Sequence, residues 1–195
     1  MVVVADNGNQ PLSLWRLGDG TLWKPLGSQG TEPGQFTYPT AVAVTGAGAL
    51  VVTDQHRVQV LTVDGAVLCV LDPTAVVGVG RLGGVLFGVA LYPGTDEILV
   101  MDYDNHRVVA LSWSSQVRCY EQCCLHTSWF FWLYRPYEGI FCFVCCIQCG
   151  LLDARAFGSQ GAQLGQLNRP GGVVVTSQRN VWVADSGNDR LVGLR

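Results

Sequence analysis

The chain has 195 residues, which suits one domain or part of a larger repeat array. Charged residues make up 14% and hydrophobic residues 49%, and the formal net charge is −3, which excludes a disordered chain and a polybasic tract for nucleic acid or anionic lipid. Polar residues break the longest apolar stretches before they reach the ~18 residues of a membrane-spanning helix, so we expect a cytoplasmic protein without membrane contact.

A long sequence repeat organises the chain. The segment GSQGTEPGQFTYP at 27–39 matches GSQGAQLGQLNRP at 158–170, and a valine-rich run that ends on an aspartate follows each segment at the same offset. Shorter copies of this run occur elsewhere, and the four marker residues are Asp6, Asp54, Asp102 and Asp185. The first three are evenly spaced, and the last gap is much longer. Spacings of nearly ~50 residues are typical of β-propeller blades.

Within each copy, short apolar runs and turns alternate. Three copies begin with runs at 42–44, 89–91 and 173–175; a second run ends on the aspartate, and a third begins at an arginine. Asp-Gly pairs supply hairpin turns, and a fourth run follows at 66–72. No stretch has sustained helical periodicity. This pattern predicts an all-β chain, a β-propeller of four-stranded antiparallel blades with about 3.5–4 blades present.

The motif of the copies resembles a known family. Gly-x-x-Gly-x-x-x-Gly-Gln-Phe/Leu-x-x-Pro, a valine-rich strand and then V-x-D with N-x-x-R are similar to the NHL repeat, most closely in VMDYDNHRVVAL and VADSGNDRLVGL. The first copy, VVVADNGNQPLSLW, lacks the arginine. The resemblance implies that 1–116 and 149–195 are propeller blades. Because NHL propellers typically have six blades, we expect a partial propeller. Its two ends either close a four-bladed ring or associate with another chain through open blade edges.

The recurring polar residues favour a structural role. An aspartate at a strand end can accept backbone N–H bonds in the turn, and the arginine after it can reach back as a charged partner. A pair repeated in every blade is typical of a fold device, not of a catalytic set. Prolines stiffen the start of a blade, and glycines allow turns with positive φ. The residues so predicted are Asp54 with Arg57, Asp102 with Arg107, Asp185 with Arg190, and Gly34, Pro39, Gly165 and Pro170.

The segment 117–148 differs from the rest, since it holds six of the eight cysteines and nine of the nineteen aromatic residues. This composition has three interpretations: a zinc module, a blade insertion and a translated intron. A zinc site would use Cys142, Cys145, Cys146 and Cys149, with Cys119, Cys123, Cys124 and His126 able to complete it. Removal of the segment brings the long gap before Asp185 close to the other two, and the codons of Gln116, Val117 and Gln148 can encode intron boundaries. We therefore favour the intron.

Two further motifs have a structural interpretation. Gly-x-Gly-x-x-Gly at 78–83 lacks the following helix that a dinucleotide site needs. His56 and His106 stand before an arginine in adjacent copies, where turn packing is favoured over metal binding.

We expect no cofactor and no catalytic residue. The predicted function is a non-catalytic protein-interaction module with binding loops on a propeller rim, since no convergent catalytic set is evident. The alternatives are a metal-dependent propeller enzyme, lyase or lactonase-like, and the substrate-recognition part of a ubiquitin ligase of the tripartite-motif class. The acidic balance disfavours RNA as the partner.

Overall fold

The computed structural model describes residues 1–9, 11–55, 57–71, 79–95, 97–113 and 151–194. The hypotheses for 117–148, for its zinc ligands and for His56 lie outside the described residues and stay predictions. No helix in the described ranges is long and apolar enough to cross a membrane.

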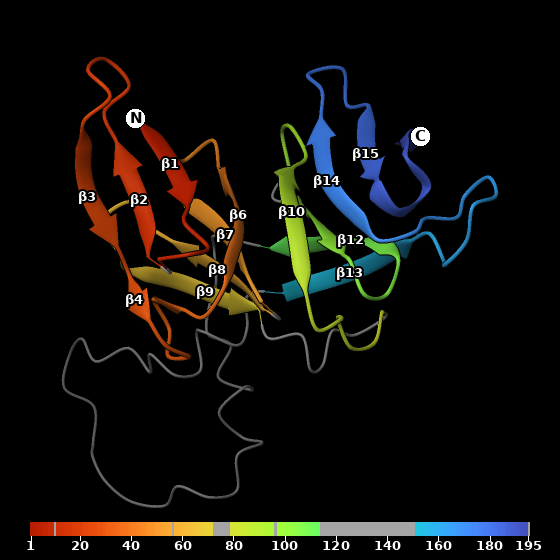
Figure 1. Cartoon of the computed structure of the whole chain (residues 1–195), viewed down its shortest axis with the longest axis horizontal. Helices are drawn as coiled ribbons and strands as arrows, with labels where there is room; N and C mark the ends of the chain where they lie inside the picture. The colour runs from red at the N-terminus through yellow and green to blue at the C-terminus, as the bar shows by residue number, and fades with distance from the viewer. Residues whose placement is uncertain (10, 56, 72–78, 96, 114–150, 195) are drawn as a thin grey trace, which may run out of the picture.

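Antiparallel sheets follow one another along the chain as four blades, which confirms the predicted all-β propeller fold (Figure 1). Blade 1 contains β1 (Val2–Ala5), β2 (Leu12–Trp15) and β3 (Leu22–Leu26). Blade 2 contains β6 (Pro39–Val44), β7 (Leu50–Asp54), β8 (Arg57–Leu61) and β9 (Val67–Leu71). Blade 3 contains β10 (Leu86–Leu91), β11 (Glu97–Asp102), β12 (Arg107–Trp113) and β13 (Leu151–Phe157). Blade 4 contains β14 (Pro170–Val175), β15 (Val181–Asp185) and β16 (Arg190–Leu194).

Two small elements lie outside the blades. The strands β4 (Ser28–Gln29) and β5 (Gln35–Phe36) pair in parallel in the loop between blades 1 and 2. A single 3-10 turn, η3 (Ser186–Asn188), joins β15 to β16. Both elements therefore belong to connections, and the blades themselves are made of strands alone.

The strand register is the same in every blade. The strand that ends on the marker aspartate is β7, β11 or β15, and its partner begins at the arginine, so Asp54 pairs with Arg57 and Asp185 with Arg190. In blade 1 the corresponding strand is β1, because Asp6 follows it directly. Blade 1 thus starts at the second strand position, and blade 4 contains the first three.

The strands on either side of the segment 114–150, β12 and β13, pair with each other in antiparallel fashion. Trp113 at the end of β12 pairs with Leu151 at the start of β13, and Ser112 pairs with Asp153. The chain on either side of the segment therefore supplies the third and fourth strands of blade 3.

In the described part of the chain, the core consists of three apolar clusters, each between two neighbouring blades. Leu14 and Leu50 belong to the cluster between blades 1 and 2, Val51 and Val100 to that between blades 2 and 3, and Leu99 and Val183 to that between blades 3 and 4. Alternation along each strand sends successive side chains to opposite faces. A central blade consequently contributes to two clusters.

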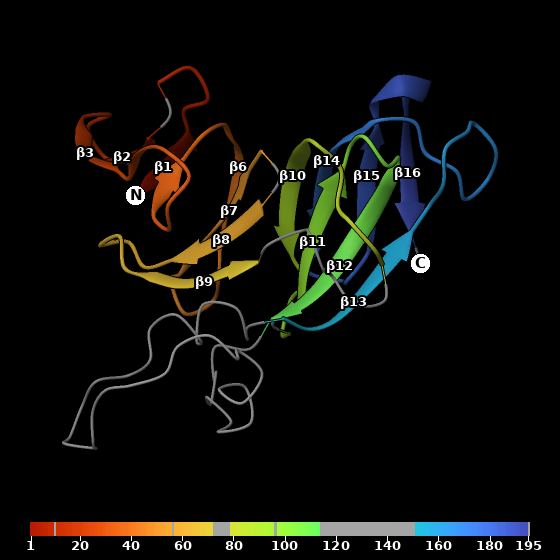
Figure 2. The same cartoon turned by 90° about the horizontal axis from the view of Figure 1, so that it is seen from below.

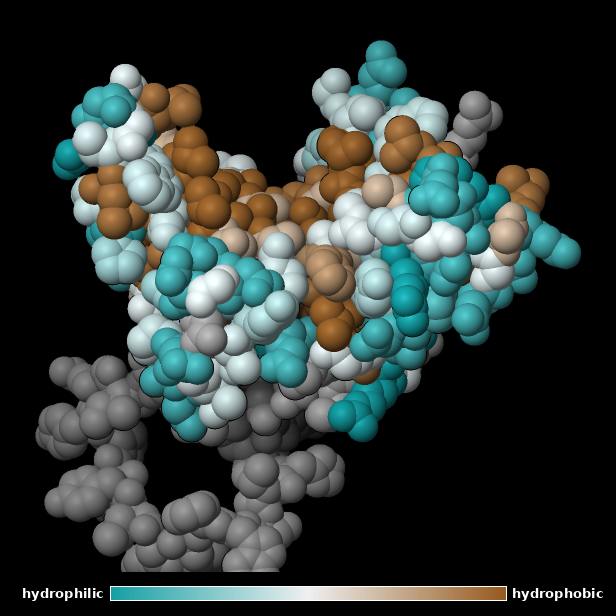
Figure 3. Space-filling model, in the orientation of Figure 1, coloured by the Kyte–Doolittle hydropathy of each residue, from teal (hydrophilic) through white to brown (hydrophobic). Residues whose placement is uncertain are grey.

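The blades form an open arc and not a closed ring. β1 packs on β6, β6 on β10 and β10 on β14, and the two views show blades 1 and 4 at opposite ends (Figures 1 and 2). Hydrophobic surface lines the notch between these end blades (Figure 3). The four-bladed closed ring is therefore wrong. Three successive blade contacts turn the chain through only part of a circle, so blade 4 does not reach blade 1.

Candidate functional site

Antiparallel connection places the blade loops on two rims. The turns after β7, β11 and β15 lie on one rim. The loops that lead into blades 2, 3 and 4, at 27–38, 79–85 and 158–169, lie on the same rim. We call this the stapled rim. The turns at 45–49, 92–95 and 176–180 join the first two strands of blades 2 to 4 and lie on the opposite side, which we call the hairpin rim.

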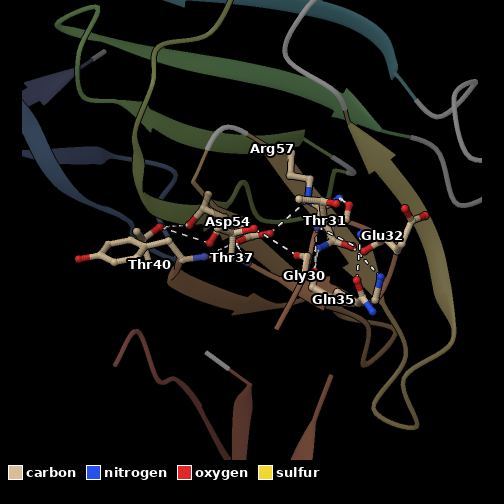
Figure 4. A network of polar contacts seen from close by, with 12 residues as sticks. Gly30, Thr31, Glu32, Gln35, Thr37, Thr40, Asp54 and Arg57 are labelled. Atoms are coloured by element: carbon tan, nitrogen blue, oxygen red, sulfur yellow. Dashed lines mark hydrogen bonds and ion pairs between the residues drawn. The ribbon is translucent and has the colours of Figure 1, made fainter. Parts of the chain in front are cut away.

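In blade 2 the aspartate and arginine fasten the loop at 27–38 (Figure 4). Asp54 Oδ1 accepts the backbone N–H groups of Thr37 and Tyr38 at 2.8 and 2.7 Å, and Asp54 Oδ2 lies 3.1 Å from Arg57 Nε. The guanidinium of Arg57 also donates to the carbonyl oxygen of Gln35 at 2.9 Å and to that of Thr31. One buried carboxylate therefore joins a turn, an arginine and a loop.

Blades 3 and 4 repeat the arrangement. Arg107 Nε lies 2.8 Å from Asp102 Oδ2, and Asp102 Oδ1 accepts the N–H of Gly83 at 2.8 Å. Arg190 Nε lies 2.7 Å from Asp185 Oδ2. Both arginines donate to loop carbonyls, and Asn105 and Asn188 donate to the same carboxylates at 3.0 and 2.8 Å. These charges are directed into the protein and not toward a shared ligand.

Blade 1 has only part of this network. Asp6 accepts hydrogen bonds from the backbone and side chain of Asn9, at 3.2 and 2.8 Å. The register that pairs Ala5 with Leu12 places Pro11 at the arginine position. A proline has no charged group and no N–H, so blade 1 lacks the loop contacts that an arginine supplies.

Electrostatics explains why Asp185 stays charged while buried. Burial raises the pKa of Asp185, but hydrogen bonds from the backbone of Asn168 and the side chains of Asn188 and Arg190, with the positive charge of Arg190, outweigh it. The pKa of Asp185 is therefore held below its ordinary value of 3.8. A carboxylate with this environment is suited to hold a loop and unsuited to accept a proton near neutral pH.

The glycine motif and the remaining histidine candidate also serve the stapled rim. The described part of 78–83 is the loop into blade 3, and the strand β10 follows it where a dinucleotide site needs a helix. His106 Nδ1 accepts the backbone N–H of Arg169 at 3.1 Å, which joins blade 3 to the loop before blade 4.

Sequence reasoning missed one buried residue of this rim, Gln59. Its side chain is fully buried, accepts the N–H of Gly34 at 2.9 Å and donates to the carbonyl oxygen of Gln35 at 2.7 Å. Its counterparts in the register are Ser13 and Val109, so no recurring pattern could have marked it.

Among the described residues, two hollows between neighbouring blades open on the hairpin rim. One hollow of about 540 Å³ lies between the turns at 45–49 and 92–95, with Leu68 and Tyr92 on its walls. The other hollow, of about 360 Å³, lies between blades 3 and 4. Tyr92 borders both, because its turn stands between the two.

The hollow between blades 3 and 4 combines aromatic and charged side chains. Arg155 on β13 forms an ion pair with Glu97 on β11. The Arg179 guanidinium lies 6.0 Å from the centre of the Tyr92 ring, and Tyr92 Oη donates to the backbone oxygen of Arg179 at 3.2 Å. The hollow continues along β13 away from the hairpin rim, and Phe157, at the end of β13 next to the stapled rim, adds a 43% exposed ring. Two strands, β11 and β13, and the turns at 92–95 and 176–180 bring these residues together, and no repeat motif includes them.

No three His, Cys, Asp or Glu side chains among the described residues lie close enough together to hold a metal ion. The proposed cysteine ligands of 142–149 stay outside these residues.

Residues 167–194 match the family model of the NHL repeat. Blade 4 therefore matches the NHL repeat. The match begins just before β14 and ends with β16, so it coincides with the observed blade and confirms the resemblance noted in the repeat motif. No curated protein matches the sequence.

Solved structures share the propeller fold at low sequence identity. A gluconolactonase from Xanthomonas campestris superposes with a TM-score of 0.57 at 17% identity over 98% of this chain and 57% of its own. An auxiliary nutrient binding protein from Bacteroides thetaiotaomicron gives 0.54 at 13%, over 96% and 43%. A catalytically inactive virginiamycin B lyase from Staphylococcus aureus gives 0.53 at 9%, over 97% and 50%. This chain thus spans about half the length of these structures.

Proposed function

We propose that the protein is a non-catalytic protein-interaction module and that its partner binds on the hairpin rim, at the hollow between blades 3 and 4. The observation that carries this proposal is the grouping of Tyr92, Phe157, Arg155 and Arg179 around one hollow. Tyrosine and arginine are enriched among the side chains that dominate binding energy at protein interfaces.

Two contacts restrain the side chains around the hollow. The Arg155–Glu97 ion pair and the hydrogen bond from Tyr92 to Arg179 hold side chains and backbone of two blades in place. Side chains that are already fixed lose less entropy on binding, which favours affinity. The stapled rim differs, because its recurring Asp–Arg pairs already bind backbone groups of the protein's own loops.

The test compares proteins captured by three immobilised forms of the chain. The first is the wild type, the second carries Tyr92→Ala and Arg179→Ala, and the third carries Tyr38→Ala and Arg81→Ala. Tyr38 and Arg81 are exposed on the stapled rim, so the third form removes the same residue types elsewhere. We expect specific partners to bind the wild type and the stapled-rim variant, and to be reduced at least ~10-fold on the hairpin-rim variant, since hot-spot truncations cost at least ~2 kcal/mol.

Two results would contradict the proposal. One is loss of partners on the stapled-rim variant with retention on the hairpin-rim variant. The other is hydrolysis of lactones or lyase activity by the purified protein with divalent cations, in the absence of any captured partner, which would favour the enzyme alternative. Transfer of ubiquitin to a captured protein would require further domains, so co-capture of ligase components tests the tripartite-motif alternative.

A further inference from the structure

Each end of the blade arc exposes an apolar sheet face. On blade 1 this leading face consists of Val2, Val4 and Trp15, which are 37–43% exposed. On blade 4 the trailing face consists of Val174, Trp182 and Leu191, which are 45–72% exposed and line a shallow hollow. Neither set contains a charged residue. The strand register identifies the equivalent residue of blades 2 and 3 for each position of these faces, and the environment of those equivalents shows what each face corresponds to.

Residues of the leading face occupy strand positions that, in blades 2 and 3, are packed against the preceding blade. In the pairing of β1 with β2, Val2 lies opposite Trp15; the same pair in blade 3 is Ile98 with Leu111. Ile98 and Leu111 are fully buried against blade 2. The equivalent residues of blade 2, Leu50 and Leu61, are buried against blade 1.

Residues of the trailing face occupy strand positions that, in blades 2 and 3, are packed against the following blade. Trp182 corresponds to Val51 in blade 2 and Leu99 in blade 3, which are 0% and 4% exposed. Leu191 corresponds in the same way to Val58 and Val108, at 0% and 1%. Gly193 lies beside the Trp182 indole, so the ring lies against the sheet.

The two kinds of face already meet inside the molecule. In the cluster between blades 2 and 3, the counterparts of the trailing face are Val51 and Val58, and they pack with the counterparts of the leading face, Ile98, Val100 and Leu111. The clusters between blades 1 and 2 and between blades 3 and 4 combine the same positions. A trailing face that packs on a leading face is therefore an interface that this fold uses three times.

We propose that two copies of this chain associate head to tail into one closed ring, with the leading face of each copy packed on the trailing face of the other. A head-to-tail contact gives a closed ring only if its rotation closes, and otherwise gives an open filament. This chain spans 57% and 50% of the length of the gluconolactonase and the lyase, so two copies together have about the length of one such propeller. Two junctions form in the same dimer, and each chain covers both of its apolar ends.

Light scattering on a size-exclusion column tests the proposal on the full chain. We expect the wild type to have twice the 21.1 kDa mass of one chain at micromolar concentration. The variants Val4→Asp and Trp182→Lys should each be monomeric, because each damages both junctions of a homodimer. A mixture of the two should regain the dimer, since one junction is then unaltered and the other has opposite charges.

The control is Leu164→Asp, which adds the same charge as Val4→Asp at a fully exposed leucine in the loop before blade 4. It should stay dimeric. A monomeric wild type, open-ended assemblies, or a dimer that survives both charged variants would each overturn the proposal. Circular dichroism of the variants shows whether they keep the β-structure. Variants at Tyr92 and Arg179 leave both end faces unchanged, so this test is independent of what the hairpin rim binds.

Discussion

Blades 2 and 3 share a strand register with blades 1 and 4 but differ from them in what covers their faces. Val100 in blade 3 is fully buried, whereas Val4, at the same position in blade 1, is 43% exposed. The residue type is identical. The presence of a neighbouring blade alone decides whether this valine is part of a core or part of a surface.

The polar network around the marker aspartate also differs between the central blades and blade 1. Asp102 of blade 3 has an arginine, an asparagine and a backbone N–H as partners, whereas Asp6 of blade 1 is bonded by Asn9. The central blades are thus fixed by apolar packing on both faces and by a stapled loop. Blade 1 has one packed face and a weaker staple, which makes it the part of the arc that we expect to open first.

The largest expected effect comes from Asp102→Ala. Because it leaves the mostly buried guanidinium of Arg107 without its carboxylate, we expect the free energy of unfolding to fall by ~3–5 kcal/mol. Asp6→Ala, the equivalent change in blade 1, should cost less than ~1 kcal/mol, since exposed pairs and caps contribute little. Urea unfolding measures both. Equal losses at the two positions would show that the central and end blades are stapled alike.

A second pair of changes separates packing within a chain from packing between chains. Ile98→Ala should lower the free energy of unfolding by ~2–5 kcal/mol at every protein concentration, because its side chain is buried within the chain. Val2→Ala, at the equivalent position of the leading face, should instead reduce the rise of the melting temperature with protein concentration. A melting temperature of the wild type that does not depend on concentration would contradict this difference.

The loops before blades 2 and 4 offer a smaller test. Gly34 and Gly165 both have φ of +81°, so alanine is strained at either position, by ~1–2 kcal/mol. A Cβ at Gly34 would lie 3.3 Å from Val67 Cγ2, while one at Gly165 would meet no atom within 4 Å. Gly34→Ala should therefore destabilise more than Gly165→Ala in thermal unfolding. The reverse order would show that the loop before blade 4 is the more tightly packed.

The smallest effect concerns pH. Because the folded-state pKa of Asp185 is lower than its ordinary 3.8, its charge stabilises the fold fully above about pH 4, and this contribution is lost as the pH falls through the folded pKa. Asp185→Asn should be less stable than the wild type at neutral pH, and the difference should shrink below pH 4. Urea unfolding across this range measures it. A difference that is constant with pH would mean that the loss is steric and not electrostatic.

Much of the fold and part of the site could be read from the residues. The long sequence repeat, the apolar runs and the Asp-Gly turns predicted the strands, and the Asp–Arg spacing predicted partners that lie 2.7–3.1 Å apart. The hollow of Tyr92, Arg155 and Arg179 could not be predicted. Its residues come from different blades and from outside the repeat motif, so only the packing of blade 3 on blade 4 brings them together.

The sequence by itself determined the local structure of this protein. Strand period, turn chemistry and the Asp–Arg pairs depend on residues close along the chain or repeated in each copy, and these interactions leave a pattern that can be read directly. The tertiary structure alone decided that the blades form an open arc with two uncovered apolar faces. That outcome depends on how far each blade contact rotates the next blade, and a rotation summed over three interfaces has no signature in any single repeat.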